Sequence, residues 1–274
     1  WKPEQEDFKA NYGWAMQATK KIGIEKNDKG EDIAQTTDIY WNPQTKKYET
    51  KKITYPIRPK RVVSLFESHL NLAWEMGLRN IVGRNATSVN GVLHPEIENN
   101  KKIQIIGEGA VLASTEKLLA LNPDLVLVDA MHTSQETKEK LLNAKIPFVE
   151  LVSSNIPYYL RSAKLMAAIA GRADLFEKVA KEMVEDITTV KSIVKEHTTK
   201  NNLIKEGSND NRVKVALTLL EAGSSAISLL GYNDRSANGS IIKTLQGRNL
   251  YEGKKNPNAQ NPSQPGNNHP GNSN

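Results

Sequence analysis

Residues 61–77, RVVSLFESHLNLAWEMG, combine a short β-branched run with a helical segment. Residues 61–65 are typical of a buried strand in a parallel sheet. The helix is expected to begin at Ser68, a good N-cap residue, and to end at Gly77, which suits the left-handed position after a helix. The two segments together predict one β-α step of an α/β fold.

The same alternation continues downstream. Strands are expected at 103–106, 125–128 and 147–151, and helices at 114–121 and 135–144. Residues 107–113 are expected to form a loop. Strands that alternate with helices in this way predict a parallel α/β lobe.

After residue 151, two helices are expected to follow one another with no strand between them. Helices are expected at 156–170 and at 174–197, the second about 36 Å long at 1.5 Å per residue. After a polar linker, residues 213–220 predict the start of a second sheet, and residues 239–247 a further helix.

The two ends carry less information about the core. A helix is expected at 3–20, followed by a hairpin whose turn is at 42–45, between strands at 38–41 and 47–50. Residues 256–274 are dominated by Asn, Pro and Gly and are expected to be disordered.

Composition limits the function classes. The net charge is +6, but Lys and Arg are spread among 31 acidic residues, so no nucleic-acid partner is expected. The chain lacks cysteine, which excludes disulfides and thiolate chemistry. No apolar run reaches the roughly 18 residues of a membrane-spanning helix. Because the chain begins at Trp1, we expect a processed or truncated product.

Four strings of sequence resemble a known family when taken in order. They are KRVVSL (60–65), MGL (76–78), IIGEG (105–109) and STEKLLALNPDLVLVD (114–129). Their order and spacing resemble the extracytoplasmic solute-binding proteins of iron-siderophore, haem and cobalamin ABC transporters, over residues 59–253. The resemblance implies two Rossmann-like α/β lobes joined by one long α-helix. Because the family has further strands and helices after this point, the second lobe is expected to be truncated.

Five segments follow from this interpretation. They are an N-terminal extension with a hairpin (1–52), an N-terminal α/β lobe (53–173), an inter-lobe helix (174–200), a partial C-terminal lobe (212–253) and a disordered tail (254–274).

Ligands of open α/β sheets bind at the carboxyl ends of the strands. The candidate ligand-binding residues at that edge are Phe66, Glu67, His69, Val111, Met131 and His132. Asp129 has the same location, and His94 lies in a loop nearby. Met and His are axial ligands that haem iron accepts, but adjacent residues cannot reach opposite haem faces. The alternatives are that the histidines are exposed loop residues and that Phe66 belongs to the core.

The resemblance implies the substrate-binding component of an importer, with no catalytic residues and no intrinsic cofactor. Its ligand would be an iron-siderophore, haem or cobalamin-type chelate, and its partner a membrane permease. The protein would work outside the cytoplasm, held at the cell membrane by a lipid anchor outside this sequence. The resemblance also implies that Glu116 docks against permease arginines. The alternative for Glu116 is a carboxylate that stabilises a helix N-terminus by ~0.3–1 kcal/mol.

Three other classes remain as alternatives. An α/β enzyme is disfavoured because no Gly-x-Ser-x-Gly motif and no set of nucleophile, base and orienting residue can be identified. A divalent-metal-binding importer component is disfavoured because three convergent His or carboxylate ligands cannot be picked out, so no metal ligands are assigned. A surface adhesion module would account for the N-terminal segment and the tail.

Overall fold

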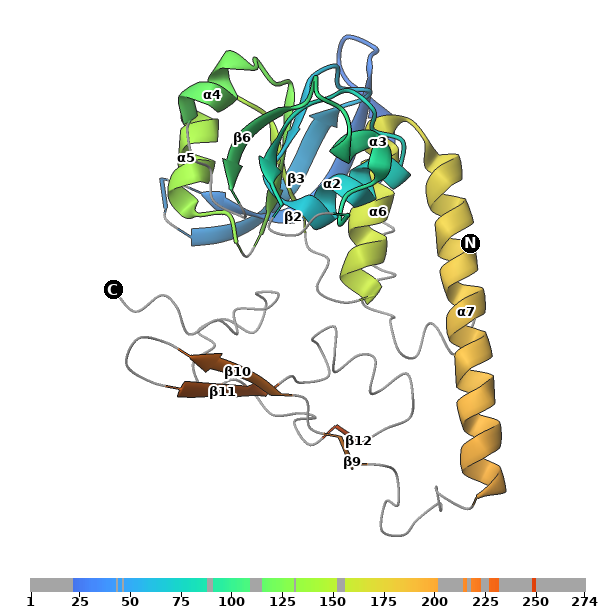
Figure 1. Cartoon of the computed structure of the whole chain (residues 1–274). Helices are drawn as coiled ribbons and strands as arrows, with labels where there is room; N and C mark the ends of the chain where they lie inside the picture. The colour runs from blue at the N-terminus through green and yellow to red at the C-terminus, as the bar shows by residue number, and fades with distance from the viewer. Residues whose placement is uncertain are drawn as a thin grey trace. The chain divides into compact units, whose positions relative to one another are not determined.

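The computed structural model describes residues 22–42, 44–45, 47–87, 91–108, 115–130, 132–151, 156–201, 214–215, 218–222, 227–231 and 248–249 (Figure 1). The chain forms two compact units. The first consists of Trp1–Ser153 with Pro157–Val179, and the second of Ser154–Ile156 with Ala180–Asn274.

The first unit contains a five-stranded parallel sheet in the order β6-β5-β4-β7-β8. Its strands are β4 (Val62–Ser64), β5 (Ile81–Ala86), β6 (Gln104–Glu108), β7 (Leu125–Asp129) and β8 (Phe148–Leu151). The chain moves outward from β4 through β5 to β6, and then returns to place β7 on the other side of β4. The strand order therefore reverses between β4 and β7, which is where open α/β sheets bind ligands. The predicted α/β fold class is confirmed.

Helices cover both faces of this sheet (Figure 1). They are α2 (Glu67–Glu75), α3 (Pro95–Glu98), α4 (Thr115–Ala120), α5 (Gln135–Asn143) and α6 (Ile156–Ala170). The core under α4 and α5 is formed by Val63, Leu65, Ile106, Leu118, Leu121, Val126, Val128 and Leu141. Because successive strand residues face opposite sides, Leu125, Leu127 and Asp129 face the other way, towards α2, which packs on β4 and β7.

Asp124 connects the turn before β7 to the start of β4. Its carboxylate accepts hydrogen bonds from the backbone amides of Lys60 at 2.7 Å and Arg61 at 2.8 Å. Arg61 in turn donates from Nε to the carbonyl of Leu121 at 2.7 Å. Asn122, with φ 45°, takes the left-handed conformation that ends the α4 segment. These hydrogen bonds therefore connect the segment KRVVSL (60–65) to the segment NPDLVLV (122–128).

The ends of α2 show one wrong prediction and one confirmed prediction. The helix begins at Glu67 and not after Ser68, because Phe66 is the extended N-cap residue, with φ −147° and ψ 131°. The Phe66 side chain makes no capping hydrogen bond, so its residue type did not identify it as the N-cap. At the other end Gly77 has φ 96°, as the predicted helix stop requires.

The sequence analysis did not identify β5 and α3. In β5 only alternate residues are buried, and Gly83 and Arg84 interrupt the apolar pattern. Gly83 is needed there for close approach, because a Cβ atom would lie 2.4 Å from Cδ1 of Leu121. The predicted loop at 107–113 is also corrected at its start, since Gly107 and Glu108 belong to β6.

A three-stranded antiparallel sheet precedes β4, in the order β1-β2-β3. Its strands are β1 (Gly23–Lys26), β2 (Asp32–Asn42) and β3 (Lys47–Pro56). Asn42 pairs with Lys47, which confirms the predicted hairpin, and Oδ1 of Asn42 accepts from the Gln44 amide at 2.9 Å. The strands are longer than predicted and β1 was not predicted. The helix expected at 3–20 lies outside the described residues.

The long helix is present as α7 (Ala173–Lys200), which includes the predicted 174–197 and continues three residues into the expected linker. The boundary between the two compact units falls within it, after Val179. Among the described residues, no helix combines the length and apolar character needed to cross a membrane.

The described part of the second unit includes two strand pairs. The first joins β10 (Thr218–Ala222) to β11 (Ile227–Gly231) antiparallel, and the second joins β12 (Arg248–Asn249) to β9 (Lys214–Val215) in parallel. The strand expected at 213–220 is therefore found as β9 and β10. The helix expected at 239–247 and the tail lie outside the described residues, and the domain boundaries stay a prediction.

Candidate functional site

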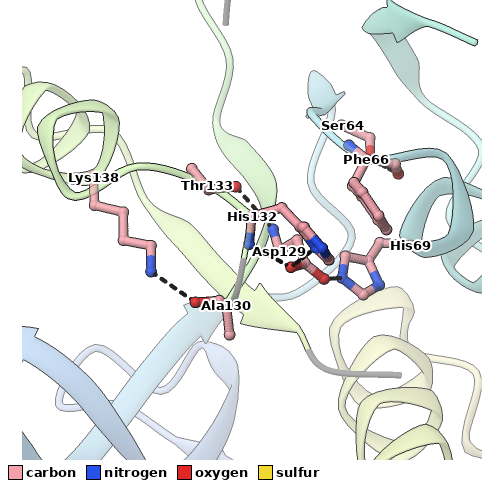
Figure 2. A network of polar contacts seen from close by, with 8 residues as sticks. All are labelled: Ser64, Phe66, His69, Asp129, Ala130, His132, Thr133 and Lys138. Atoms are coloured by element: carbon pink, nitrogen blue, oxygen red, sulfur yellow. Dashed lines mark hydrogen bonds and ion pairs between the residues drawn. The ribbon is translucent and has the colours of Figure 1, made fainter. Parts of the chain in front are cut away.

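The candidate site lies where β4 and β7 end, at the reversal of strand order. Ser64 is the last residue of β4 and leads to Phe66, while Asp129 is the last residue of β7 and leads to His132. Figure 2 shows these side chains with His69 of α2, gathered around the carboxylate of Asp129.

Asp129 binds two imidazoles through different oxygens. Nε2 of His69 lies 2.7 Å from Oδ2, and Nδ1 of His132 lies 2.7 Å from Oδ1. The backbone amide of His132 donates to the same Oδ1 at 2.8 Å. Because Asp129 is on the face of β7 that α2 covers, its carboxylate meets His69 from that helix. The carboxylate therefore links α2 to the loop after β7.

His69 lies inside the protein. It is on the buried side of α2 together with Leu72, Ala73 and Met76, which follow at helical spacing. Its side chain has no exposed surface, and its Nδ1 has no hydrogen-bond partner within the described ranges. His69 is thus placed behind Asp129 and not at the surface where the sequence analysis expected it to meet a ligand.

The charge of Asp129 follows from its surroundings. Burial raises the pKa of the Asp129 carboxyl, but the hydrogen bond and charge of His69, together with the backbone hydrogen bond and charge of His132, outweigh it and lower the pKa to about 2. The group is therefore a carboxylate at neutral pH and accepts from both rings. Consequently the proton-bearing nitrogen is Nε2 in His69 and Nδ1 in His132.

Phe66 and His132 form a parallel aromatic pair. Their ring centroids are 5.1 Å apart and the planes differ by 6°, while Phe66 and His69 are tilted by 47° at 5.3 Å. Oγ of Ser64 donates to the carbonyl of Phe66 at 2.9 Å and so fixes the backbone between β4 and α2. The His132 side chain is 40% exposed. His132 is thus partly accessible to solvent, while Phe66 is half-buried.

The loop that carries His132 is held at both ends. Oγ1 of Thr133 accepts from the Asp129 amide at 3.1 Å, and the Thr133 amide donates to the Asp129 carbonyl at 3.1 Å. Nζ of the buried Lys138 donates to the carbonyl of Ala130 at 3.3 Å and forms an ion pair with Glu150 at 3.3 Å. These bonds restrict the path of the loop.

The structure brings three of the predicted ligand-binding residues together: Phe66, His69 and His132. Glu67 follows as the first residue of α2 and is half-buried. Val111 and Met131 lie outside the described residues. His94 is the N-cap of α3, where Nδ1 accepts from the Glu96 amide at 3.3 Å. Glu116 is exposed in the first turn of α4.

Sequence reasoning missed the supporting residues Thr133 and Lys138, and it did not assign the bridging role of Asp129. A signal for Lys138 existed, because Leu141 follows it at i+3 and is buried on the same side of α5. For Asp129 the signal was a carboxylate directly after four buried apolar residues.

The donor atoms of the site do not converge on one point. Both imidazoles are directed at the carboxylate, and the described residues contain no group of three or more His, Cys, Asp or Glu side chains that could hold a metal ion. What the site offers is an imidazole and a phenyl ring in parallel, backed by a charged and buried hydrogen-bond network.

The chain matches one family of known proteins over most of its length. Residues 62–260 match the family model described as periplasmic binding protein. No curated protein sequence matches the chain.

Several solved structures share the fold. The siderophore-binding protein BauB, bound to a complex of two acinetobactin molecules and ferric iron, is 17% identical, with a TM-score of 0.52, over 78% of this chain and 67% of that one. The vitamin B12-binding protein BtuF of Vibrio cholerae is 13% identical, with a TM-score of 0.52, over 74% and 70%. The haem-binding protein RhuT from Roseiflexus sp. RS-1 is 20% identical, with a TM-score of 0.51, over 69% and 65%. The chain thus spans about two thirds of the length of these structures.

Proposed function

The chain belongs to the periplasmic binding protein family, and from this membership we propose that it is the substrate-binding component of an ABC importer. Proteins of this family bind substrates and do not transform them, and they work outside the cytoplasm. The proposed task is to capture a small molecule and deliver it to a membrane permease.

The proposed cargo is a metal chelate of the iron-siderophore, haem or cobalamin type. The names of the three solved structures support this class, since those proteins bind a ferric siderophore, haem and vitamin B12. The observation that carries the proposal is the Phe66–His132 pair at the reversal of strand order. In the part of the site that the structure describes, no three His, Cys, Asp or Glu side chains converge, which suits a metal that arrives with most of its coordination positions already filled.

A ligand panel tests this function. Haemin, ferric hydroxamate and catecholate siderophores, aquocobalamin, Mn²⁺ and Zn²⁺ would each be added to the 274-residue chain while thermal unfolding is followed. A ligand that binds the native state raises the melting temperature by mass action. We expect one of the chelates to do so. A shift with Mn²⁺ or Zn²⁺ alone would support the divalent-metal alternative, and no shift with any member would contradict the proposal.

We further propose that Glu116 contacts the permease. The residue is exposed in the first turn of α4, the helix that follows β6. A carboxylate there can pair with basic permease residues, and such pairing sets orientation and encounter rate more than affinity.

A further inference from the structure

The two edges of the five-stranded parallel sheet differ in charge. The segments that follow its strands at their carboxyl ends contain no Lys, Arg, Asp or Glu; they are 65–66, 87–94, 109–114, 130–134 and 152–155. The segments that lead into the same strands at their amino ends contain seven Lys and Arg residues and one carboxylate; they are 57–61, 76–80, 99–103, 121–124 and 144–147. All amino ends of a parallel sheet lie at one edge, so the fold collects cations that are spread along the sequence. We call these five leading segments the basic edge.

Neighbouring segments of the basic edge are bonded to one another. Nδ2 of Asn80 donates to the carbonyl of Pro59 at 3.1 Å, and the Val62 amide donates to the carbonyl of Asn80 at 2.9 Å. Asp124 accepts from two backbone amides of the segment 57–61. Because adjacent strands are about 4.8 Å apart, the five segments span roughly 20 Å. The Debye length is about 8 Å at physiological ionic strength, so neighbouring cations act together on a charged partner.

The cations of the basic edge are exposed. They are Arg58, Lys60 and Arg61 before β4, Arg79 before β5, Lys101 and Lys102 before β6, and Lys145 before β8. Within the described ranges, none of these seven side chains forms an ion pair. Two of them are held in place: Arg61 donates to the carbonyl of Leu121 at 2.7 Å, and the guanidinium of Arg79 lies 4.3 Å from the ring centroid of Trp74.

The carboxylates near the basic edge do not cancel its charge. Asp124 already accepts from two backbone amides, and Glu98, the last residue of α3, accepts from the Gly91 amide at 2.8 Å. Glu75 is the last residue of α2. Arg172, after α6, pairs with Asp174 at 2.7 Å and adds no net charge. The seven cations therefore outnumber the three remaining carboxylates by more than two to one.

We propose that the basic edge binds the surface of a membrane rich in anionic phospholipids. Lys and Arg near such a surface each strengthen binding roughly fivefold. The choice of a membrane rests on the proposed function, which places the protein beside a permease. A single-stranded nucleic acid is disfavoured as the partner, because the five segments contain no aromatic residue on which a base could stack.

This mode of binding keeps the candidate site away from the membrane. The Phe66–His132 pair follows the carboxyl ends of β4 and β7, which are at the opposite edge of the sheet. A protein held by its basic edge therefore has its candidate site open to solution, where cargo is captured. Attraction between exposed charges is screened by salt, so this contact is reversible and the protein can turn to the permease.

Co-sedimentation with vesicles tests the proposal. The 274-residue chain is mixed with vesicles of phosphatidylcholine alone, or of equal parts of phosphatidylcholine and phosphatidylglycerol, at several salt concentrations. One variant is Lys101→Gln/Lys102→Gln/Lys145→Gln. Its matched control, Lys29→Gln/Lys195→Gln/Lys200→Gln, removes the same charge from exposed positions outside the basic edge. Thermal unfolding checks that each variant is folded.

We expect the unsubstituted chain to bind only the vesicles that contain phosphatidylglycerol, and less tightly as the salt concentration rises. The first variant should bind at least about tenfold more weakly, and the control within about threefold of the unsubstituted chain. Equal loss in the two variants, or equal binding to both kinds of vesicle, would overturn the inference. Equally tight binding of soluble polyphosphate, at the same phosphate concentration, would show a site for polyanions in solution and also overturn it.

A second measurement keeps every cation of the basic edge. The chain has no cysteine, so a single introduced cysteine can carry a fluorescent label. Asn143→Cys labels the last residue of α5, next to the basic edge, and Glu136→Cys labels the first turn of the same helix. Both positions are exposed. On vesicles with a nitroxide quencher in the lipid headgroup, the label at 143 should be quenched at least about threefold more than the label at 136. Equal or reversed quenching would contradict the orientation.

The outcome is separate from that of the proposed function. Vesicle binding is measured without cargo, so its failure leaves any melting-temperature shift in the ligand panel unaffected. Conversely, a chain that binds none of the chelates but binds anionic vesicles through its basic edge would contradict the proposed function and support this inference.

Discussion

The imidazole of His69 and the carboxylate of Asp129 are 2.7 Å apart and buried, although sixty residues separate them in the sequence. One comes from the helix after β4 and the other from the end of β7. Their contact therefore fixes the spacing of the two elements that present Phe66 and His132.

Replacing His69 by leucine should destabilise the protein strongly. The change leaves the Asp129 carboxylate buried without one of its donors, and removing one partner of a buried pair costs about 3–5 kcal/mol. The free energy of unfolding from urea titration measures this. The double variant His69→Leu/Asp129→Asn should recover part of the loss, because the charge is gone. A loss below about 1 kcal/mol in the single variant would contradict the assigned role.

Lys138→Met should destabilise the loop that carries His132. The substitution keeps the length of the buried side chain but removes the ion pair with Glu150 and the bond to the Ala130 carbonyl. We expect a loss of roughly 3 kcal/mol and faster amide hydrogen exchange at Thr133. Glu150→Gln on its own removes only the charge of the partner and is the matched comparison. Unchanged exchange at Thr133 would show that Lys138 does not hold this loop.

Gly77→Ala and Gly30→Ala form a matched pair. Both glycines have positive φ, 96° and 76°, so alanine is strained by about 1–2 kcal/mol at either position. A Cβ atom at Gly30 would meet open space, whereas at Gly77 it would lie 3.0 Å from Cγ of Arg172 and 3.1 Å from Cδ1 of Leu175. We expect Gly77→Ala to cost at least about 1 kcal/mol more, as overpacking does. Equal melting temperatures would disprove the close contact.

Glu116→Arg should abolish uptake of the ligand by cells while ligand affinity and melting temperature stay nearly unchanged. Reversal of the charge turns attraction to a basic permease surface into repulsion. Glu136→Arg, at the first turn of the neighbouring α5, is the control, because it makes the same charge change on an exposed helix start. Normal uptake by Glu116→Arg, or uptake lost equally in both variants, would leave Glu116 as a residue that only stabilises its helix.

The centre of the first α/β lobe could be predicted from sequence because β4 and β7 are buried along their whole length. The segment 125–128 is apolar without interruption, and β7 is found there. By contrast, β5 is half-buried and contains Gly83, so its pattern was too weak to recognise. Phe66 was unexpected as an N-cap because its role depends on backbone geometry and not on a capping side chain.

The candidate site was predictable in location but not in side-chain direction. The rule that ligands bind at strand carboxyl ends found Phe66, His69 and His132, which do lie together. It could not show that His69 turns inward, because that depends on which face of α2 packs on β7. The helical spacing of His69 with Leu72, Ala73 and Met76 contains this information. The pairing of His69 with Asp129 needed the strand order, whereas His132 lies only three residues after Asp129.

The bond between Asp124 and the amide of Lys60 has a consequence for how freely the sequence can vary. The bond uses the main chain of Lys60, so it does not depend on which side chain position 60 carries, with the exception of proline, which has no amide hydrogen. Position 124 needs its carboxylate, because two amides converge on it. In a saturation library selected for folding, tolerance at these two directly bonded positions should therefore be opposite: broad at 60 and narrow at 124.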